Sequence, residues 1–134
     1  MFNFRAVVRV LAQHDVEFAI VGAVAGVMQG APIDTQALAV LYSLKAPNPA
    51  RLLAAVAELD ATFWEHRRRL RPDISHMESR GHKLLATRHG RIDCLGTIEA
   101  STTYEDVLHH TATAAQKSAL RYSPEVLMSA LRFR

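Results

Sequence analysis

Two short apolar runs constrain the fold of this chain more than any other feature. Residues 16–22 (VEFAIVG) place Val16, Phe18 and Ile20 on one face and end at a glycine, and residues 37–43 (ALAVLYS) form a second such run. Short runs of this composition are typical of β-strands. Because segments of helical periodicity lie before and between these runs, the sequence predicts a mixed α/β (α+β) fold, with a small mixed central sheet flanked by helices.

Helical periodicity is clearest in two segments. Residues 4–11 carry apolar side chains at helical spacing, and Asn3 precedes them as a candidate N-cap. Residues 47–60 (PNPARLLAAVAELD) predict a longer helix, with Asn48 as the cap and Pro49 at the first helical position. Shorter helices are expected over residues 23–29, over residues 104–110 after Thr103, and from Ser123 onwards.

The second half of the chain contains a predicted hairpin. Residues 82–88 (HKLLATR) and 91–98 (RIDCLGTI) flank His89 and Gly90, which indicates two antiparallel strands joined by a tight turn. The only cysteine, Cys94, falls inside the second of these strands and is expected to be a packed thiol. Residues 61–80 have no clear periodicity, and we expect them to be partly strand and partly loop.

Length and composition indicate one ordinary domain. The chain has 134 residues, of which 49% are hydrophobic and 22% charged, so a single domain over residues 1–134 is expected. The N-terminal segment is interrupted by Arg5 and Arg9 and predicts neither a signal peptide nor a membrane span. We therefore expect a cytoplasmic protein without a membrane partner. Its oligomeric state is left open.

The chain is mildly basic, and its arginines are unevenly distributed. The net charge is +3 and the sequence pI is about 9.4. Arg67, Arg68, Arg69 and Arg71 lie together in the run HRRRLR. Such a run either contacts phosphate groups or is simply a solvated surface, and charge alone does not decide between the two.

Two blocks of residues, in the right order and at the right separation, resemble the nucleotidyltransferase superfamily. The blocks have the form seen in the minimal bacterial nucleotidyltransferases and abortive-infection toxins of that group. The first block follows the frame G-G-x-A-x-x-x-H-G-x-P-R-x-T-x-D-[IL]-D through Gly22, Ala25, Gly30, Pro32, Thr35, Leu38 and Val40. The second follows L-L-T-x-x-G-x-[IL]-D-x-L-G…Y-x-x-L through Leu84, Leu85, Thr87, Gly90, Asp93, Leu95, Gly96, Tyr104 and Leu108.

The resemblance implies a site for a nucleoside triphosphate (NTP) and Mg²⁺. Gly22, Ala23 and Thr35 would serve the triphosphate, since a strand that ends at a glycine before a helix lets backbone N–H groups approach phosphates closely. The metal-binding carboxylates of the family stand at positions 37 and 39. Asp93 lies at the position of a third carboxylate, which completes the metal site or serves as the base. Carboxylates one residue apart on a strand point the same way and can hold two Mg²⁺ ions.

This chain has alanine at both metal positions. Ala37 and Ala39 supply no oxygen ligand, and Asp93 alone would leave Mg²⁺ mostly hydrated, so the chain as written is expected to be catalytically dead. Gln29 and Ile33 also depart from the family frame. Either two aspartates were deliberately replaced while Asp93 was kept, or the protein is a natural pseudoenzyme.

The family reaction moves a nucleoside monophosphate (NMP) from Mg²⁺-bound NTP to a hydroxyl group, with pyrophosphate leaving. The resemblance leaves the acceptor open between an RNA 3′ end, a protein side chain and a small molecule. Arg67, Arg68, Arg69 and Arg71 are candidate contacts to the acceptor or to phosphate. The alternative is a module that binds a nucleotide, an RNA or a partner protein without chemistry, for example within a toxin–antitoxin pair.

Overall fold

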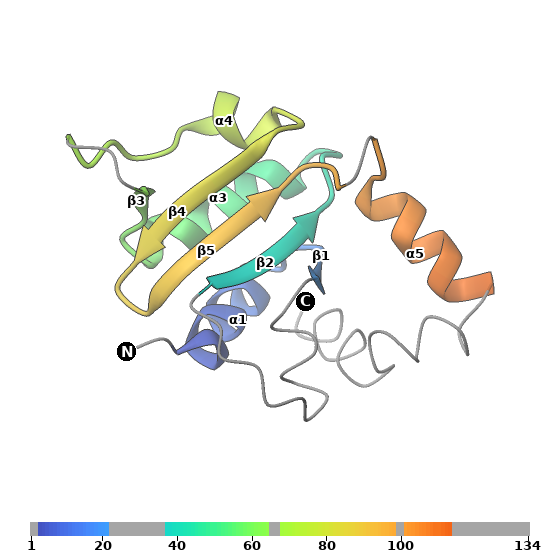
Figure 1. Cartoon of the computed structure of the whole chain (residues 1–134), viewed down its shortest axis with the longest axis horizontal. Coiled ribbons are helices and arrows are strands. Elements are labelled where there is room, and N and C mark those ends of the chain that lie inside the picture. The colour runs from blue at the N-terminus through green and yellow to red at the C-terminus, as the bar shows by residue number, and fades with distance from the viewer. Residues whose placement is uncertain (1–2, 22–36, 65–67, 99–100, 114–134) are drawn as a thin grey trace.

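The protein folds around one five-stranded mixed sheet, seen in a computed structural model that describes residues 3–21, 37–64, 68–98 and 101–113 (Figure 1). The strand order is β1-β2-β5-β4-β3. β2 and β5 run parallel, and every other neighbouring pair is antiparallel. The strands are β1 (Phe18–Val21), β2 (Ala37–Tyr42), β3 (Thr62–Phe63), β4 (His82–Thr87) and β5 (Gly90–Leu95).

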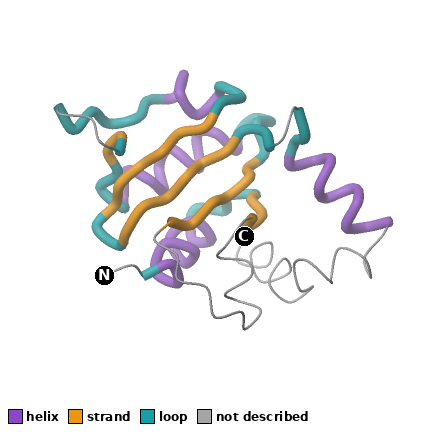
Figure 2. Tube along the Cα trace, in the orientation of Figure 1, coloured by secondary structure: helices purple, strands orange, loops and turns teal. Residues whose placement is uncertain are grey.

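Four helices accompany the sheet in the described part of the chain: α1 (Phe4–Gln13), α3 (Asn48–Glu58), α4 (Ile74–Glu78) and α5 (Tyr104–Thr113). α1 and α3 lie behind the sheet. α5 lies on the side of β1 and β2, away from β3 (Figures 1 and 2). The predicted mixed α/β architecture is therefore confirmed. The helices expected over residues 23–29 and from Ser123 onwards lie outside the described residues.

The two faces of the sheet differ in burial because side chains alternate along each strand. Val40 and Tyr42 of β2 and Ile92 of β5 are fully buried in the main core, together with apolar side chains of α1 and α3. A smaller cluster on the opposite face joins Leu41 and Leu95 to the start of α5. On that second face, the neighbouring residues of β2 and β5 are only partly buried: Ala37, Ala39, Arg91 and Asp93.

The helix predicted at residues 4–11 is confirmed, and so is its cap. The backbone N–H of Ala6 donates to Asn3 Oδ1 at 3.2 Å. Such a bond satisfies one of the backbone donors that a helix leaves unpaired at its start.

The helix at α3 is also confirmed, but Asn48 is not its cap. The N-cap position is Pro47. The Asn48 side chain is buried and bonds backbone atoms of Glu17 and Ser43. Its amide accepts from Glu17 N at 2.7 Å and donates to Glu17 O at 3.0 Å and to Ser43 O at 2.8 Å. The cap prediction was wrong because the side-chain amide forms these three bonds, two of them to Glu17 far away in the sequence, instead of a local cap.

Residues 61–80 contain a helix that the sequence did not indicate. Besides β3 and loop, this region forms the five-residue helix α4, with Asp73 as N-cap: its side chain accepts from His76 N. Met77 is fully buried, and its carbonyl oxygen accepts from the Tyr42 hydroxyl at 2.6 Å. A single turn with one buried apolar residue is too short to show a helical period.

The predicted hairpin is confirmed, with its turn one residue earlier than expected. β4 and β5 pair antiparallel up to Thr87 and Gly90, so the turn residues are Arg88 and His89. The helix predicted after Thr103 is confirmed as well, since Thr103 N donates to Asp106 Oδ2 and Asp106 N donates to Thr103 Oγ1. Over the ranges that the structure describes, no helix is long and apolar enough to cross a bilayer.

Candidate functional site

The structure brings together three of the residues predicted for the reaction centre. Ala37 and Ala39 lie on β2, and Asp93 lies on the neighbouring parallel strand β5. Ala39 is the direct register partner of Asp93, and Ala37 is the partner of Arg91. Register partners project from the same face of a sheet, so all four side chains share the partly covered face.

The Asp93 carboxylate is held by an arginine that the sequence analysis missed. Arg91 Nε lies 2.8 Å from Asp93 Oδ1, and Arg91 Nη2 lies 3.3 Å from Asp93 Oδ2. The side chains are 30% and 17% exposed, so the pair is partly shielded from water. A guanidinium that reaches both oxygens of a carboxylate compensates its charge directly. The signal was present in the sequence, because residues two apart on a strand share a face.

Trp64 extends this site toward the edge of the sheet. It follows β3 directly, and its backbone N–H donates to Leu84 O at 2.8 Å. The guanidinium carbon of Arg91 lies 5.4 Å from the centroid of a Trp64 ring, which is within cation–π range. The indole itself is 44% exposed. Asp93 and Arg91 of β5 and Trp64, which directly follows β3, thus form a row that crosses the intervening strand β4.

The residues at this row do not fit a resident Mg²⁺ ion. Mg²⁺ takes six oxygen ligands in near-octahedral geometry and is held by one or two carboxylates together with substrate phosphates. Here Ala37 and Ala39 offer methyl groups, and both oxygens of Asp93 already accept from Arg91. Among the residues that the structure describes, no three His, Cys, Asp or Glu side chains lie close enough together to hold a metal.

Several predicted site residues lie outside the described ranges. These are Gly22, Ala23 and Thr35, assigned to the triphosphate, and Arg67 of the arginine run. The remaining arginines of the run separate in the structure. Arg69 and Arg71 line a pocket, whereas Arg68 does not.

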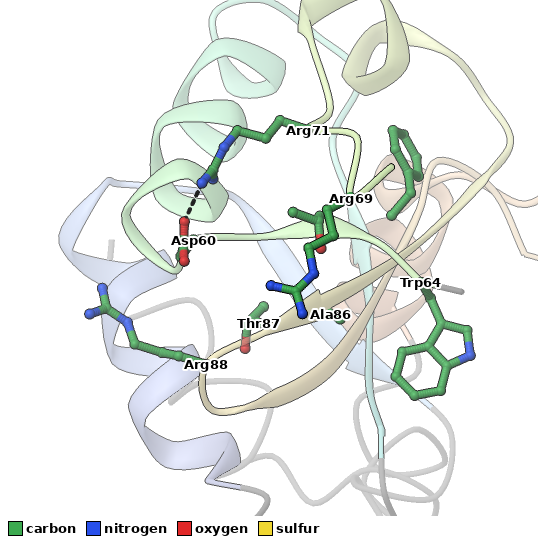
Figure 3. A pocket seen from close by; sticks show the side chains of 9 residues that line it. Asp60, Trp64, Arg69, Arg71, Ala86, Thr87 and Arg88 are labelled. Carbon is green, nitrogen blue, oxygen red and sulfur yellow. Dashed lines mark hydrogen bonds and ion pairs between the residues drawn. The ribbon is translucent and has the colours of Figure 1, made fainter. Parts of the chain in front are cut away.

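The pocket has a volume of about 470 Å³ and lies at the β3 edge of the sheet (Figure 3). Its polar and aromatic lining residues are Asp60, Thr62, Phe63, Trp64, Arg69, Arg71, Thr87 and Arg88. Arg88 comes from the turn of the hairpin, so arginines from two separate parts of the chain meet here. Sequence reasoning did not single out Arg88, because its proximity to Arg69 depends on the pairing of β3 with β4.

The three arginines of the pocket are held differently. Arg71 Nη2 donates to Asp60 Oδ1 at 2.5 Å, and this hydrogen bond is the main cause that lowers the pKa of the Asp60 carboxyl. Arg88 donates through Nη2 to the carbonyl oxygen of Glu58 at the end of α3. The Arg69 guanidinium points into the middle of the lining residues (Figure 3), and within the described ranges it has no hydrogen-bond partner. With three guanidinium groups against one carboxylate, the pocket is positively charged.

Buried polar groups on the opposite face belong to the core. Lys83 is 3% exposed on β4, and burial lowers its pKa to about 8. The predicted packed thiol is confirmed, since Cys94 is fully buried and burial raises its pKa to about 12. Burial and, to a smaller extent, Cys94 raise the pKa of Tyr42 as well. These groups face α1, α3 and α4, away from Asp93.

Comparison with known proteins gives no relative. The chain matches no protein-family model, no curated protein and no solved structure. Any functional reading therefore depends on the residues and geometry described above.

Proposed function

We propose that this chain is a nucleotidyltransferase-fold domain whose reaction centre is the row of Ala37, Ala39 and Asp93. The observation that carries the proposal is the register of β2 and β5. It places Asp93 opposite Ala39 on an accessible sheet face, where two carboxylates on one strand would face a third on the next. The family reaction is the transfer of NMP from an NTP to a hydroxyl group, with release of pyrophosphate.

In its present sequence the domain is inactive in this reaction. Alanine side chains at positions 37 and 39 supply no ligand oxygen, and the remaining carboxylate is paired with Arg91. We infer no catalytic step from the residues present. The geometry instead identifies positions 37 and 39 as the places where carboxylates should restore activity.

The test is the double variant Ala37→Asp/Ala39→Asp, assayed with each α-labelled NTP and Mg²⁺. RNA and protein acceptors are supplied, and transfer of labelled NMP is followed on gels. We expect labelling from the double variant and none from the present sequence. A matched control is Ala37→Asn/Ala39→Asn, which has nearly the same shape without the charge, and Asp93→Asn in the double variant should abolish labelling.

Arg91 requires one further variant in this experiment. A carboxylate at position 37 would stand directly opposite Arg91 and compete for its guanidinium. The triple variant Ala37→Asp/Ala39→Asp/Arg91→Gln removes this competition and frees Asp93. If both restored proteins fold normally and neither transfers NMP to any acceptor, the proposed reaction centre is wrong.

A second candidate function is favoured by the Arg91–Asp93 pair. The two-point contact neutralises the carboxylate without a metal, as expected for a domain that binds its ligand or partner but performs no chemistry. This candidate is a pseudoenzyme that recognises a nucleotide, an RNA or a partner protein. It predicts that the restored proteins stay silent in the transfer assay while the present sequence binds such a ligand without added Mg²⁺.

A further inference from the structure

The pocket at the β3 edge has two chemical features that together suit one class of ligand. Its positive charge comes from Arg69, Arg71 and Arg88, and its exposed aromatic surface comes from Trp64. Guanidinium groups bind phosphate oxygens, and an exposed indole offers a face on which a nucleobase stacks. The volume of about 470 Å³ is within the usual range of small-molecule sites.

We propose that this pocket binds a nucleotide unit, with its phosphate at Arg69 and its base on Trp64. The unit is either a free nucleotide or one residue of a single strand, since both present the same phosphate and base. Inorganic phosphate would use the arginines and leave the indole unused. The inference concerns binding alone and does not depend on NMP transfer.

Arg69 is the group best placed to hold the phosphate. Arg71 is engaged with Asp60, and Arg88 holds the carbonyl of Glu58 at the end of α3. Arg69 points into the pocket and has no such bond among the described residues, so binding an anion would break no hydrogen bond of this side chain to those residues (Figure 3). Even with Asp60 counted, the lining carries an excess of two positive charges.

Arg91 covers one side of the Trp64 ring. Arg91 lies against the indole, 5.4 Å from a ring centroid, and is itself fixed by Asp93. This contact orients the ring and leaves its other surface for a base. Because strands are about 4.8 Å apart, β3 and β5 are separated by about 10 Å, so the pocket shares Trp64 with the Asp93 row but lies apart from Asp93 itself.

Trp64 also provides the assay, because it is the only tryptophan of the chain. Its fluorescence is titrated with AMP, with a twelve-residue oligouridylate RNA and with tripolyphosphate, an anion without a base. We expect saturable quenching by AMP, by the RNA or by both, and none by tripolyphosphate. Quenching by AMP identifies a free-nucleotide site, and quenching by the RNA alone identifies a single-strand site.

The variants isolate the role of Arg69. We expect Arg69→Asn to weaken binding about tenfold, as loss of one charge-assisted phosphate contact would. Asparagine accommodates the left-handed backbone at this position, where φ is 49°, so the fold should be kept. Arg51→Gln is the matched control: it removes one positive charge from the exposed surface of α3, and should change binding less than twofold. Arg69→Lys, which keeps the charge but not the fork of donors, should be intermediate.

Salt dependence gives an independent readout if the RNA binds. Each phosphate contact to a single strand contributes about −0.7 to the slope of log K against log salt. Arg69→Asn should therefore reduce the slope by about 0.7, and Arg51→Gln should leave it unchanged. The proposal is overturned if no nucleotide or RNA quenches Trp64 saturably, or if Arg69→Asn and Arg51→Gln affect binding equally.

Discussion

Lys83 lies on β4 with 3% of its surface exposed, on the side of the sheet that packs against the main core. Its Nζ donates to Ser79 O and lies 5.1 Å from the centroid of the Tyr42 ring. These contacts favour the ammonium form, but burial outweighs them and lowers the pKa of Lys83 from 10.5 to about 8. The stability of the protein should therefore depend on pH through this one side chain.

The sign of the dependence follows from proton binding. Between pH 8 and pH 10.5 the unfolded chain keeps the Lys83 proton while the folded chain has released it, so folding is favoured as the pH rises through this window. One pKa unit corresponds to about 1.4 kcal/mol. The contribution of Lys83 should accordingly increase by about 2.5 kcal/mol from pH 7 to pH 10.

The measurement compares wild type with Lys83→Met, which keeps an unbranched side chain of similar length. Urea unfolding is followed by circular dichroism at pH 7, 8, 9 and 10, and the difference in unfolding free energy is taken at each pH. The difference cancels the titrating groups that do not interact with Lys83. Cys94 does interact with Lys83, but burial raises its pKa to about 12 and loss of Lys83 would raise it further, so the folded thiol stays protonated up to pH 10 in both proteins. We expect wild type to gain about 2.5 kcal/mol relative to Lys83→Met across this range. Lys45→Met, at an exposed lysine, is the matched control.

A free-energy difference that stays constant within about 0.5 kcal/mol from pH 7 to pH 10 would refute the reasoning. Such a result would mean that Lys83 remains fully charged in the fold, with its desolvation offset by Ser79 and Tyr42. A difference that changes in the opposite direction would mean that these contacts dominate.

Two further predictions test the packing around the sheet. A Cβ added at Gly96 would lie 2.8 Å from backbone atoms of residues 79–80, so Gly96→Ala should lower the unfolding free energy by about 2–3 kcal/mol, measured by urea unfolding. Gly81→Ala is the control, because a Cβ there meets no atom within 4 Å and should change stability by less than about 0.5 kcal/mol. Tyr42→Phe leaves the carbonyl of Met77 without its 2.6 Å hydrogen bond, and should cost about 1–2 kcal/mol at pH 7 in the same assay. No loss on Tyr42→Phe would show that the bond does not stabilise the fold.

Predictions that depend on neighbouring residues in the chain were mostly right. The cap at Asn3, the helix over residues 48–58 and the β4–β5 hairpin each follow from patterns within about a dozen residues. α4 was missed because one helical turn carries too little periodicity. Asn48 was assigned to the wrong partner because its amide bonds Glu17, which the pairing of β1 with β2 brings near it.

The residues of the candidate site likewise separate into those that a local sequence pattern places and those that strand pairing places. The sequence alone placed Ala37 and Ala39 on one strand face, and the R-x-D spacing was enough to place Arg91 beside Asp93. Only the parallel pairing of β2 with β5 sets Ala39 opposite Asp93, and only the pairing of β3 with β4 brings Trp64 and Arg69 to Arg88.

The physical reason is the range of the interactions. Alternation and capping are fixed by backbone geometry over a few residues, so the sequence determined the strand faces, the helix starts and the identity of each side chain. Strand register is fixed by which faces can be buried together, a property of the whole sheet and its helices. The tertiary structure therefore decided that a lysine enters the core, that Ala39 lies opposite Asp93, and that distant arginines form one pocket.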